Sequence, residues 1–186
     1  MTMRRIDLPL PGLCLLEPRV FSDTRGCFFE TWNEKVLREL GIEAHFVQEN
    51  LSRSVRGVLR GLHYQLPHPQ GKLVRVQAGR IFDVVVDLRR ASATRGRWHG
   101  QVLDDGGTQL LWVPAGFAHG FLALSESAQV QYAVTDYYTP GAEYTIAWND
   151  PALAIAWPLA QAGVSEPVVS AKDAQGVALG AAPLFD

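Results

Sequence analysis

The chain alternates short apolar runs with glycine- and proline-rich turns over most of its length. From residue 45 onward these runs are rich in β-branched and aromatic residues and recur about every ten positions, which is typical of strands. We expect strands at residues 13–18, 27–32, 45–50, 58–63, 73–78, 81–88, 97–103, 109–113, 120–124, 129–135 and 144–148. Strands at this spacing predict a sandwich, a jelly roll or a barrel. Helical patterns do not interleave with them, so a parallel α/β fold is not expected.

One helix is predicted at residues 34–40. Asn33 can cap its first turn, and Val36, Leu37 and Leu40 share one face. Gly41 stands where a helix often ends in a left-handed residue. The 186 residues suit a single domain, 1–186, with a C-terminal tail from about residue 158 that packs on the β-structure.

Composition places the chain among globular proteins, with 47% hydrophobic and 19% charged residues. No apolar run approaches the roughly 18 residues of a membrane span, and residues 1–12 lack the apolar stretch of a secretion signal. We therefore expect a cytoplasmic protein with no membrane partner. Cys14 and Cys27 are too few for a disulfide framework and are expected to be reduced thiols.

The distribution of charge bears on the ligand. A formal net charge of -2 argues against general nucleic-acid binding. Between residues 53 and 75, however, the chain carries five cations and no acidic residue: Arg53, Arg56, Arg60, Lys72 and Arg75. Such a cluster suits a small phosphorylated ligand.

The segment 58–76 holds the first candidates for catalysis. His63 is a candidate base, and Arg60 lies three positions before it. On a regular strand these two would face opposite sides, so both reach one cavity only if Gly61 bends the strand or carries a bulge. Lys72 follows a proline-rich connection that can turn the chain back. If the two flanking runs pair, His63 and Lys72 face one pocket.

Other polar residues interrupt apolar strands. Asp83 and Asp87 are four apart and share a face, so Asp83 either faces solvent on an edge or lines a basic pocket. His119 is expected to begin a strand at a cavity mouth, as a hydrogen-bonded structural group or as a catalyst. Tyr132 lies in mid-strand, where an aromatic residue is ordinary core material.

These residues fall within segments that resemble the dTDP-4-dehydrorhamnose 3,5-epimerase family in order and spacing. The matching segments are residues 23–30, 46–52, 58–65, 71–76, 82–89, 112–121, 132–138, 148–151 and 170–173. The resemblance implies a mainly β cupin fold, an antiparallel jelly roll with a few short helices.

It also implies an isomerase that needs no cofactor. The family converts dTDP-4-dehydro-6-deoxy-D-glucose to dTDP-4-dehydro-L-rhamnose by inverting C3 and C5, whose protons are acidified by the C4 carbonyl. His63 matches the base, with Asp173 as the carboxylate that orients it. Lys72 matches the cation beside the enolate oxygen, and Tyr132 matches the acid on the opposite face.

The resemblance further assigns residues to substrate binding. They are Arg25, Phe28, Glu30, Gln48, Asn50, Arg60, Asp83, His119, Tyr138 and Lys172. The first three match a segment that enters the neighbouring subunit's nucleotide site, so a homodimer that exchanges residues 1–35 or so is expected. Tyr138 matches an aromatic residue near the thymine base.

A catalytic metal is the main rival mechanism, because many cupins place a His-x-His pair and a glutamate in their first motif. Here Gln65 replaces the second histidine of that pair, and residues 67–78 contain no acidic residue. The remaining histidines, His63 and His119, fall short of the three or four ligands of a tight site. No metal is therefore predicted.

Three functions remain open. They are a 3,5-epimerase, a 3- or 5-monoepimerase or ketoisomerase on a related dTDP-4-keto sugar, and a sugar-nucleotide-binding cupin without catalysis. His63 and Tyr132 together favour an epimerase over mere binding.

Overall fold

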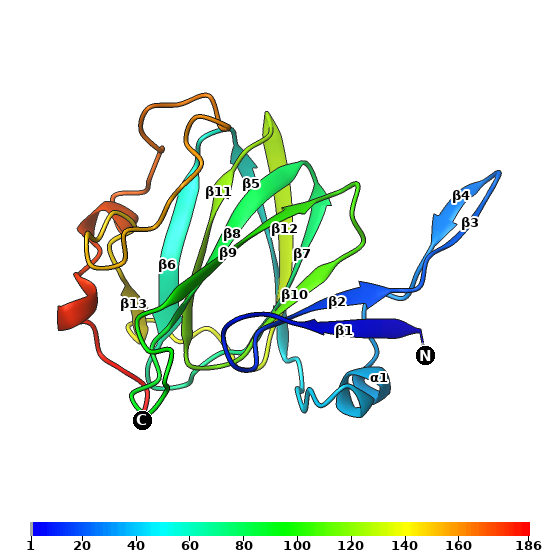
Figure 1. Cartoon of the computed structure of the whole chain (residues 1–186), viewed down its shortest axis with the longest axis horizontal. Coiled ribbons are helices and arrows are strands. Elements are labelled where there is room, and N and C mark those ends of the chain that lie inside the picture. Colours follow the sequence, from blue (N-terminus) through cyan, green and yellow to red (C-terminus); the bar gives the residue numbers. More distant parts are fainter. Residues whose placement is uncertain (1) are drawn as a thin grey trace.

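The computed structural model describes residues 2–186 and is built mainly from two antiparallel sheets that face each other (Figure 1). The six-stranded sheet has the order β1 (Met3–Asp7), β2 (Cys14–Pro18), β10 (Leu110–Val113), β7 (Lys72–Ala78), β12 (Ser127–Val134) and β5 (Gln48–Val55). The five-stranded sheet has the order β13 (Glu143–Thr145), β6 (Leu59–Gln65), β11 (Phe117–Ala123), β8 (Arg80–Asp87) and β9 (Trp98–Asp104). This is the expected jelly roll.

The core between the sheets follows from the alternation of side chains along each strand. Val74 and Val130 of the six-stranded sheet pack with Val85 and Phe121 of the five-stranded sheet. Burial of such side chains contributes roughly 1.5–3 kcal/mol each. The sheets are thereby held at a fixed separation, on which any site between them depends.

Each sheet is covered on its outer face. The helix α1 (Glu34–Glu39) and the segment after it pack Leu37 and Ile42 against Leu16 and Leu110 of the six-stranded sheet. The segment that follows β13, including the C-terminal tail, packs Leu153 and Phe185 against the five-stranded sheet, beyond β6 and β13 (Figure 1). The tail contains two 3₁₀ turns, Asp173–Gln175 and Leu179–Ala181.

The helix α1 is capped by the residues that were predicted to bound it. The Asn33 side chain accepts hydrogen bonds from the backbone N–H groups of Lys35 and Val36 at 3.0 and 3.4 Å. Gly41 adopts φ +77° just after the helix, a conformation that costs glycine little. The predicted cap and stop are both confirmed.

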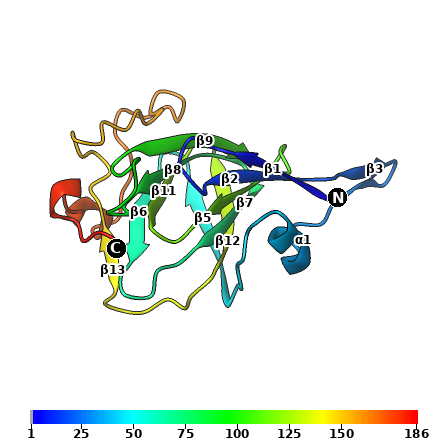
Figure 2. The same cartoon turned by 60° about the horizontal axis from the view of Figure 1, so that its bottom comes forward.

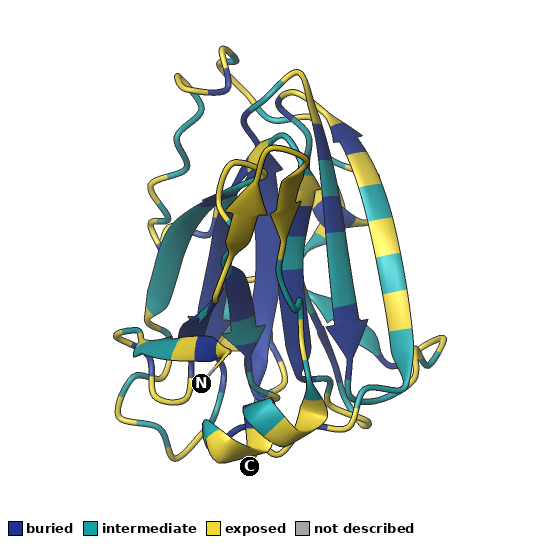
Figure 3. Cartoon of the chain, turned by 90° about the vertical axis from the view of Figure 1, so that its right-hand side faces the viewer, coloured by how far each residue is buried: buried dark blue, intermediate teal, exposed yellow. Residues whose placement is uncertain are grey.

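Several predicted boundaries were wrong. Residues 27–32 do not form one strand; instead β3 (Phe21–Asp23) and β4 (Gly26–Phe28) form an isolated hairpin that projects from the molecule (Figure 1). Its residues are exposed (Figure 3). β5 runs five residues beyond the predicted end, and β1 was missed altogether, because its sequence MRRID carries too few apolar residues.

The two runs on either side of residues 66–71 do not pair with each other, so the condition stated for them is not met. β6 pairs with β11 and β13, whereas β7 pairs with β10 and β12. The connection between β6 and β7 therefore crosses from one sheet to the other (Figure 2). His63 and Lys72 lie on facing sheets, not on neighbouring strands.

Candidate active site

His63 and Asp173 form a close pair. The Nε2 atom of His63, on β6, lies 2.6 Å from Oδ1 of Asp173, which the tail brings back over the sheet. Burial would raise the pKa of Asp173, but hydrogen bonds from His63 and from the Gly61 N–H outweigh it and leave the pKa lowered. Asp173 is thus a carboxylate at neutral pH, and His63 must donate Nε2–H to it. The free lone pair of neutral His63 is then on Nδ1, the atom available as a base.

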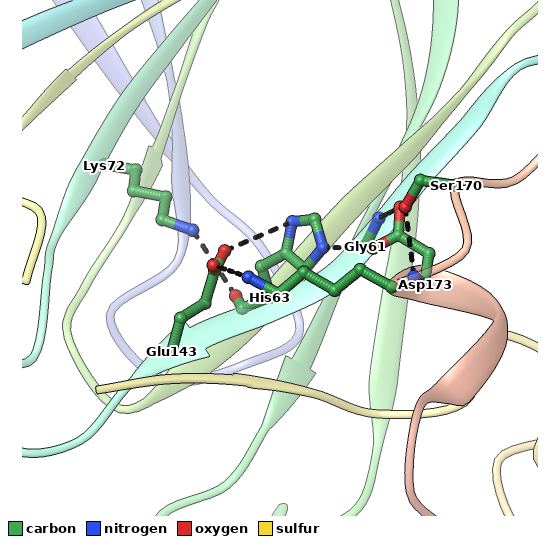
Figure 4. A network of polar contacts seen from close by, with 7 residues as sticks. Gly61, His63, Lys72, Glu143, Ser170 and Asp173 are labelled. Carbon is green, nitrogen blue, oxygen red and sulfur yellow. Dashed lines mark hydrogen bonds and ion pairs between the residues drawn. The ribbon is translucent and has the colours of Figure 1, made fainter. Parts of the chain in front are cut away.

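Lys72 approaches His63 from the other sheet. Its Nζ donates a hydrogen bond to the backbone oxygen of His63 at 3.4 Å (Figure 4). The residue is only 9% exposed, and burial lowers the pKa of Lys72 to about 8, although the negative charges of Glu143 and Asp83 oppose this. A weakly solvated ammonium group is well suited to stabilise a negative oxygen.

Tyr132 also belongs to the six-stranded sheet. It lies opposite Asn50 in the β12–β5 pairing and packs against the core between the sheets. Burial raises the pKa of Tyr132 above its usual 10.0, helped by Glu143 and opposed by Arg60. The phenol is therefore protonated at neutral pH, as a proton donor must be.

Glu143 was not found from the sequence. Its Oε1 lies 4.0 Å from Nδ1 of His63, and its Oε2 is paired with Lys172 (Figure 4). It follows a Pro-Gly turn on a strand of three residues, a place where an acidic residue is usually solvated. Only the pairing of β13 with β6 brings it to the site.

Strand β6 has a β-bulge at Gly61, where a bend or a bulge was expected. His119 pairs with His63 and Phe121 with Arg60, so two residues of β6 lie opposite Gly120 alone. Gly61 has φ +118°, and a Cβ there would lie 2.6 Å from the Gly120 Cα. Only glycine allows this approach.

Asp83 and His119 form a second, fully enclosed pair. Nε2 of His119 lies 2.9 and 2.8 Å from the two carboxylate oxygens of Asp83, which is 0% exposed. The alternative of a solvent-facing Asp83 is thereby wrong. So is the expected placement of His119 at a strand start, since it lies within β11. Asp87 is also buried and is satisfied by Arg89 and by two hydroxyl groups.

Comparison with known proteins places these residues in a family. A family model described as dTDP-4-dehydrorhamnose 3,5-epimerase matches residues 7–180. The chain belongs to this family. The Pseudomonas aeruginosa enzyme of that name is 51% identical over 98% of this chain and 99% of its own length.

Solved structures of epimerases agree in fold. The Legionella pneumophila 3,5-epimerase, in complex with dTDP-4-keto-L-rhamnose, superimposes with a TM-score of 0.92 at 46% identity over 97% of this chain and 95% of that one. A 3'-monoepimerase from Streptomyces bikiniensis, in complex with dTDP-quinovose, has a TM-score of 0.85 at 33% identity over 93% of this chain and 86% of that one. The cupin-like fold and membership among sugar-nucleotide epimerases are thus shown.

Within this epimerase fold, five residues matched to substrate binding lie near the catalytic candidates, and Gln48 is one of them. Asn50 accepts a hydrogen bond from Nε2 of Gln48 at 2.9 Å. Arg60 donates to Oγ of Ser54 at 2.9 Å and so links the two sheets. Tyr138 is half exposed, and its N–H donates to Gln48. Pairing with Glu143 raises the pKa of Lys172.

The other three lie elsewhere. Arg25 pairs with Asp23 on the β3–β4 hairpin, which lies on the opposite side of the molecule from β13 (Figure 1). Phe28 is 72% exposed there, and Glu30 accepts hydrogen bonds from Thr2 and Asn33. A hollow of about 740 Å³ is lined by this hairpin alone. Within one chain, then, the structure does not bring these residues to His63.

Metal ligands do not gather at the site. Residues 2–186 contain no group of three or more His, Cys, Asp or Glu side chains arranged to hold an ion. His63 and His119 face each other across two strands, yet each Nε2 is already engaged by its own carboxylate. A reaction without metal remains a prediction.

In the described part of the chain, residues 2–186, no helix has the length and apolar character that spanning a membrane would require.

Proposed function

We propose that this protein inverts C3 and C5 of dTDP-4-dehydro-6-deoxy-D-glucose, giving dTDP-4-dehydro-L-rhamnose. The observation that carries the proposal is the arrangement of the base and the acid. His63, oriented by Asp173, belongs to one sheet, and Tyr132 belongs to the facing sheet. Inversion of a carbon needs a proton removed from one face and delivered to the other.

The steps follow from the residues. Nδ1 of His63 takes the proton from C5 or C3, and the electrons of the broken C–H bond pass to the C4 oxygen as an enolate. Lys72 stabilises that negative charge, in a place where burial keeps water from screening it. Tyr132 then delivers a proton to the opposite face, and exchange with solvent restores both groups. Asp173 stabilises the imidazolium formed in between.

The nucleotide is held at the edge of the site. We assign the thymine contact to Tyr138 and polar contacts to Gln48, Asn50, Arg60 and Lys172, as the family resemblance implies. We assign the buried Asp83–His119 pair to binding of the sugar part of the substrate. Because the sugar nucleotide is a small anionic metabolite, we place the reaction in the cytoplasm.

We also propose that the site is completed by a second copy of this chain. The exposed hairpin carries Arg25 and Phe28 and has no function within its own chain that would require an aromatic side chain 72% exposed. In a homodimer it would reach the partner's nucleotide. Light scattering at micromolar concentration should give the mass of a dimer; a monomer with full activity would contradict this assignment.

A monoepimerase is the second candidate, supported by the similarity to the Streptomyces bikiniensis 3'-monoepimerase. Incubation in heavy water separates the alternatives by nuclear magnetic resonance of the sugar. Deuterium at C3 and C5 with inversion of both supports the proposal, and deuterium at one centre supports a monoepimerase. No exchange would support a binding protein.

Two variants test the roles of acid and base. His63→Ala should abolish exchange at both carbons, a loss of roughly a hundredfold or more. Tyr132→Phe keeps the ring but lacks the donor, so exchange should outlast net inversion. If Tyr132→Phe inverts both centres at close to the wild-type rate, Tyr132 is a core residue and not the acid.

A further inference from the structure

Gln65 is a buried polar residue that the mechanism does not use. It stands at the end of β6, two residues after His63, and is only 3% exposed. Its position is the one at which the metal-binding cupin pattern places a histidine. A buried amide must find hydrogen-bond partners, and those of Gln65 lie on loops outside its own strand.

These partners are backbone groups of two loops. Nε2 of Gln65 donates to the backbone oxygens of His68 at 2.7 Å and Tyr137 at 3.1 Å. Its Oε1 accepts from the N–H of Thr139 at 2.9 Å. Both N–H donors and one lone pair are therefore used, three of the four hydrogen bonds that an amide side chain can make.

Two further glutamines hold the same loop, which comprises residues 135–142 and connects β12 to β13 (Figure 2). Nε2 of Gln70 donates to the backbone oxygen of Asp136 at 2.8 Å. Oε1 of Gln48 accepts from the N–H of Tyr138 at 3.1 Å. Residues 136–139 are thus held one after another by glutamine side chains.

Backbone hydrogen bonds tie the two ends of the loop: Thr135 donates to Gly71, Leu66 donates to Ala142, and Ala142 donates to Thr139. They leave residues 136–138 to the glutamines. Within residues 2–186, the strand pairings end at Val134 on β12 and resume at Glu143 on β13. Glutamine side chains supply hydrogen bonds where strand pairing is absent. They come from both sheets, because Gln48 belongs to the six-stranded sheet and Gln65 to the five-stranded sheet. The loop that they fix carries Tyr138 and leads directly into Glu143, which faces His63.

We propose that Gln65 and Gln70 are positioning residues that fix the 135–142 loop, so that Tyr138 is preorganised for the nucleotide before it binds. This inference rests on the proposed function, because it assigns the nucleotide to Tyr138. A fixed loop avoids the entropy cost of ordering an aromatic side chain on binding. Neither glutamine touches the reacting carbons.

The test is a double-mutant cycle with dTDP as the probe. Gln65→Met keeps the side-chain length and removes all three hydrogen bonds. We expect its Kd for dTDP to rise about three- to tenfold, the range that loss of an aromatic contact produces. In a Tyr138→Ala background the same change should have less than about a twofold effect, because residues that act through one another are not additive.

Control variants keep the outcome clear. Gln77→Met removes an exposed glutamine whose side chain hydrogen-bonds Gln131 on β12, away from the 135–142 loop, and it should leave the dTDP affinity unchanged. If Gln65→Met does not fold, Gln70→Met carries the cycle, because this residue is only partly buried and holds one carbonyl. An equal rise in Kd in both backgrounds, or an unchanged Kd with a lower Tm, would overturn the proposal.

Amide hydrogen exchange tests the loop without nucleotide. The Thr139 N–H should exchange at least about tenfold faster in Gln65→Met than in the wild type, and at an unchanged rate in Gln77→Met. Unchanged exchange at Thr139 would refute the positioning role. If instead the wild type does not bind dTDP, the proposed function fails, and the preorganisation of Tyr138 for a nucleotide is refuted with it.

Discussion

Lys72 is the residue at which activity and stability should conflict most clearly. Its pKa falls from 10.5 to about 8 because burial disfavours the ammonium form. One pKa unit corresponds to about 1.4 kcal/mol, so the charged side chain costs the folded state about 3 kcal/mol. Lys72→Met keeps the apolar stem and removes the charge. At pH 7 it should raise the free energy of unfolding by up to about 3 kcal/mol while lowering the epimerisation rate roughly a hundredfold or more.

The pH dependence of this gain follows from the two pKa values. Between pH 8 and 10.5 the folded wild type has lost the Lys72 proton while the unfolded chain still binds it, so wild-type stability rises with pH. The advantage of the Met variant should therefore be full below pH 8 and vanish by about pH 10.5. Urea unfolding of both proteins at several pH values measures it. Lys35→Met, at an exposed position of α1, is the matched control and should show neither effect.

Two results would refute this reasoning. A Met variant less stable than the wild type at pH 7 would mean that the folded protein stabilises the ammonium group more than water does. A gain that stays constant from pH 7 to 10.5 would mean that the charge of Lys72 is not its source. Either would leave Lys72 without the desolvated charge on which its proposed role depends.

Three further predictions concern the same site. Asp173→Asn should lower kcat roughly a hundredfold or more and leave the dTDP affinity, measured by calorimetry, within about twofold; a matching loss of affinity would argue for a structural role. Gly61→Ala should destabilise the protein by more than about 1 kcal/mol in urea unfolding, whereas Gly180→Ala, whose added Cβ meets no atom within 4 Å, should be nearly neutral. Treatment with a chelator should leave activity intact, and a loss that one metal ion restores would overturn the metal-free mechanism.

Local features were predictable because their causes are local. Asn33 and Gly41 bound α1 through contacts within a few residues of themselves. The bend or bulge expected at Gly61, should Arg60 and His63 reach one cavity, followed from strand geometry, and the structure has the bulge. The strand-rich character of the chain followed from alternation and turn residues in the same way.

Features that depend on contacts distant in sequence could not be predicted. Glu143 reaches the site because β13 pairs with β6. In this pairing it lies opposite Gln65, from which it is 78 positions away in the sequence. The role of Gln65 was equally hidden, because its partners Tyr137 and Thr139 lie on a loop that no local signal connects to β6. In the sequence it is visible only as the residue that breaks a metal-binding pattern.

The two runs on either side of residues 66–71 could have paired in one sheet, and the fact that they do not bears on the proposed mechanism. Had β6 and β7 formed a hairpin that paired Gln65 with Lys72, His63 and Lys72 would project from the same face of one sheet. Such an arrangement approaches a sugar ring from one side only. The observed crossing places His63 on one sheet and Lys72 with Tyr132 on the other. A sugar ring bound between the sheets would then meet His63 from one face and Tyr132 from the opposite face, which is the geometry that the proposed inversion requires.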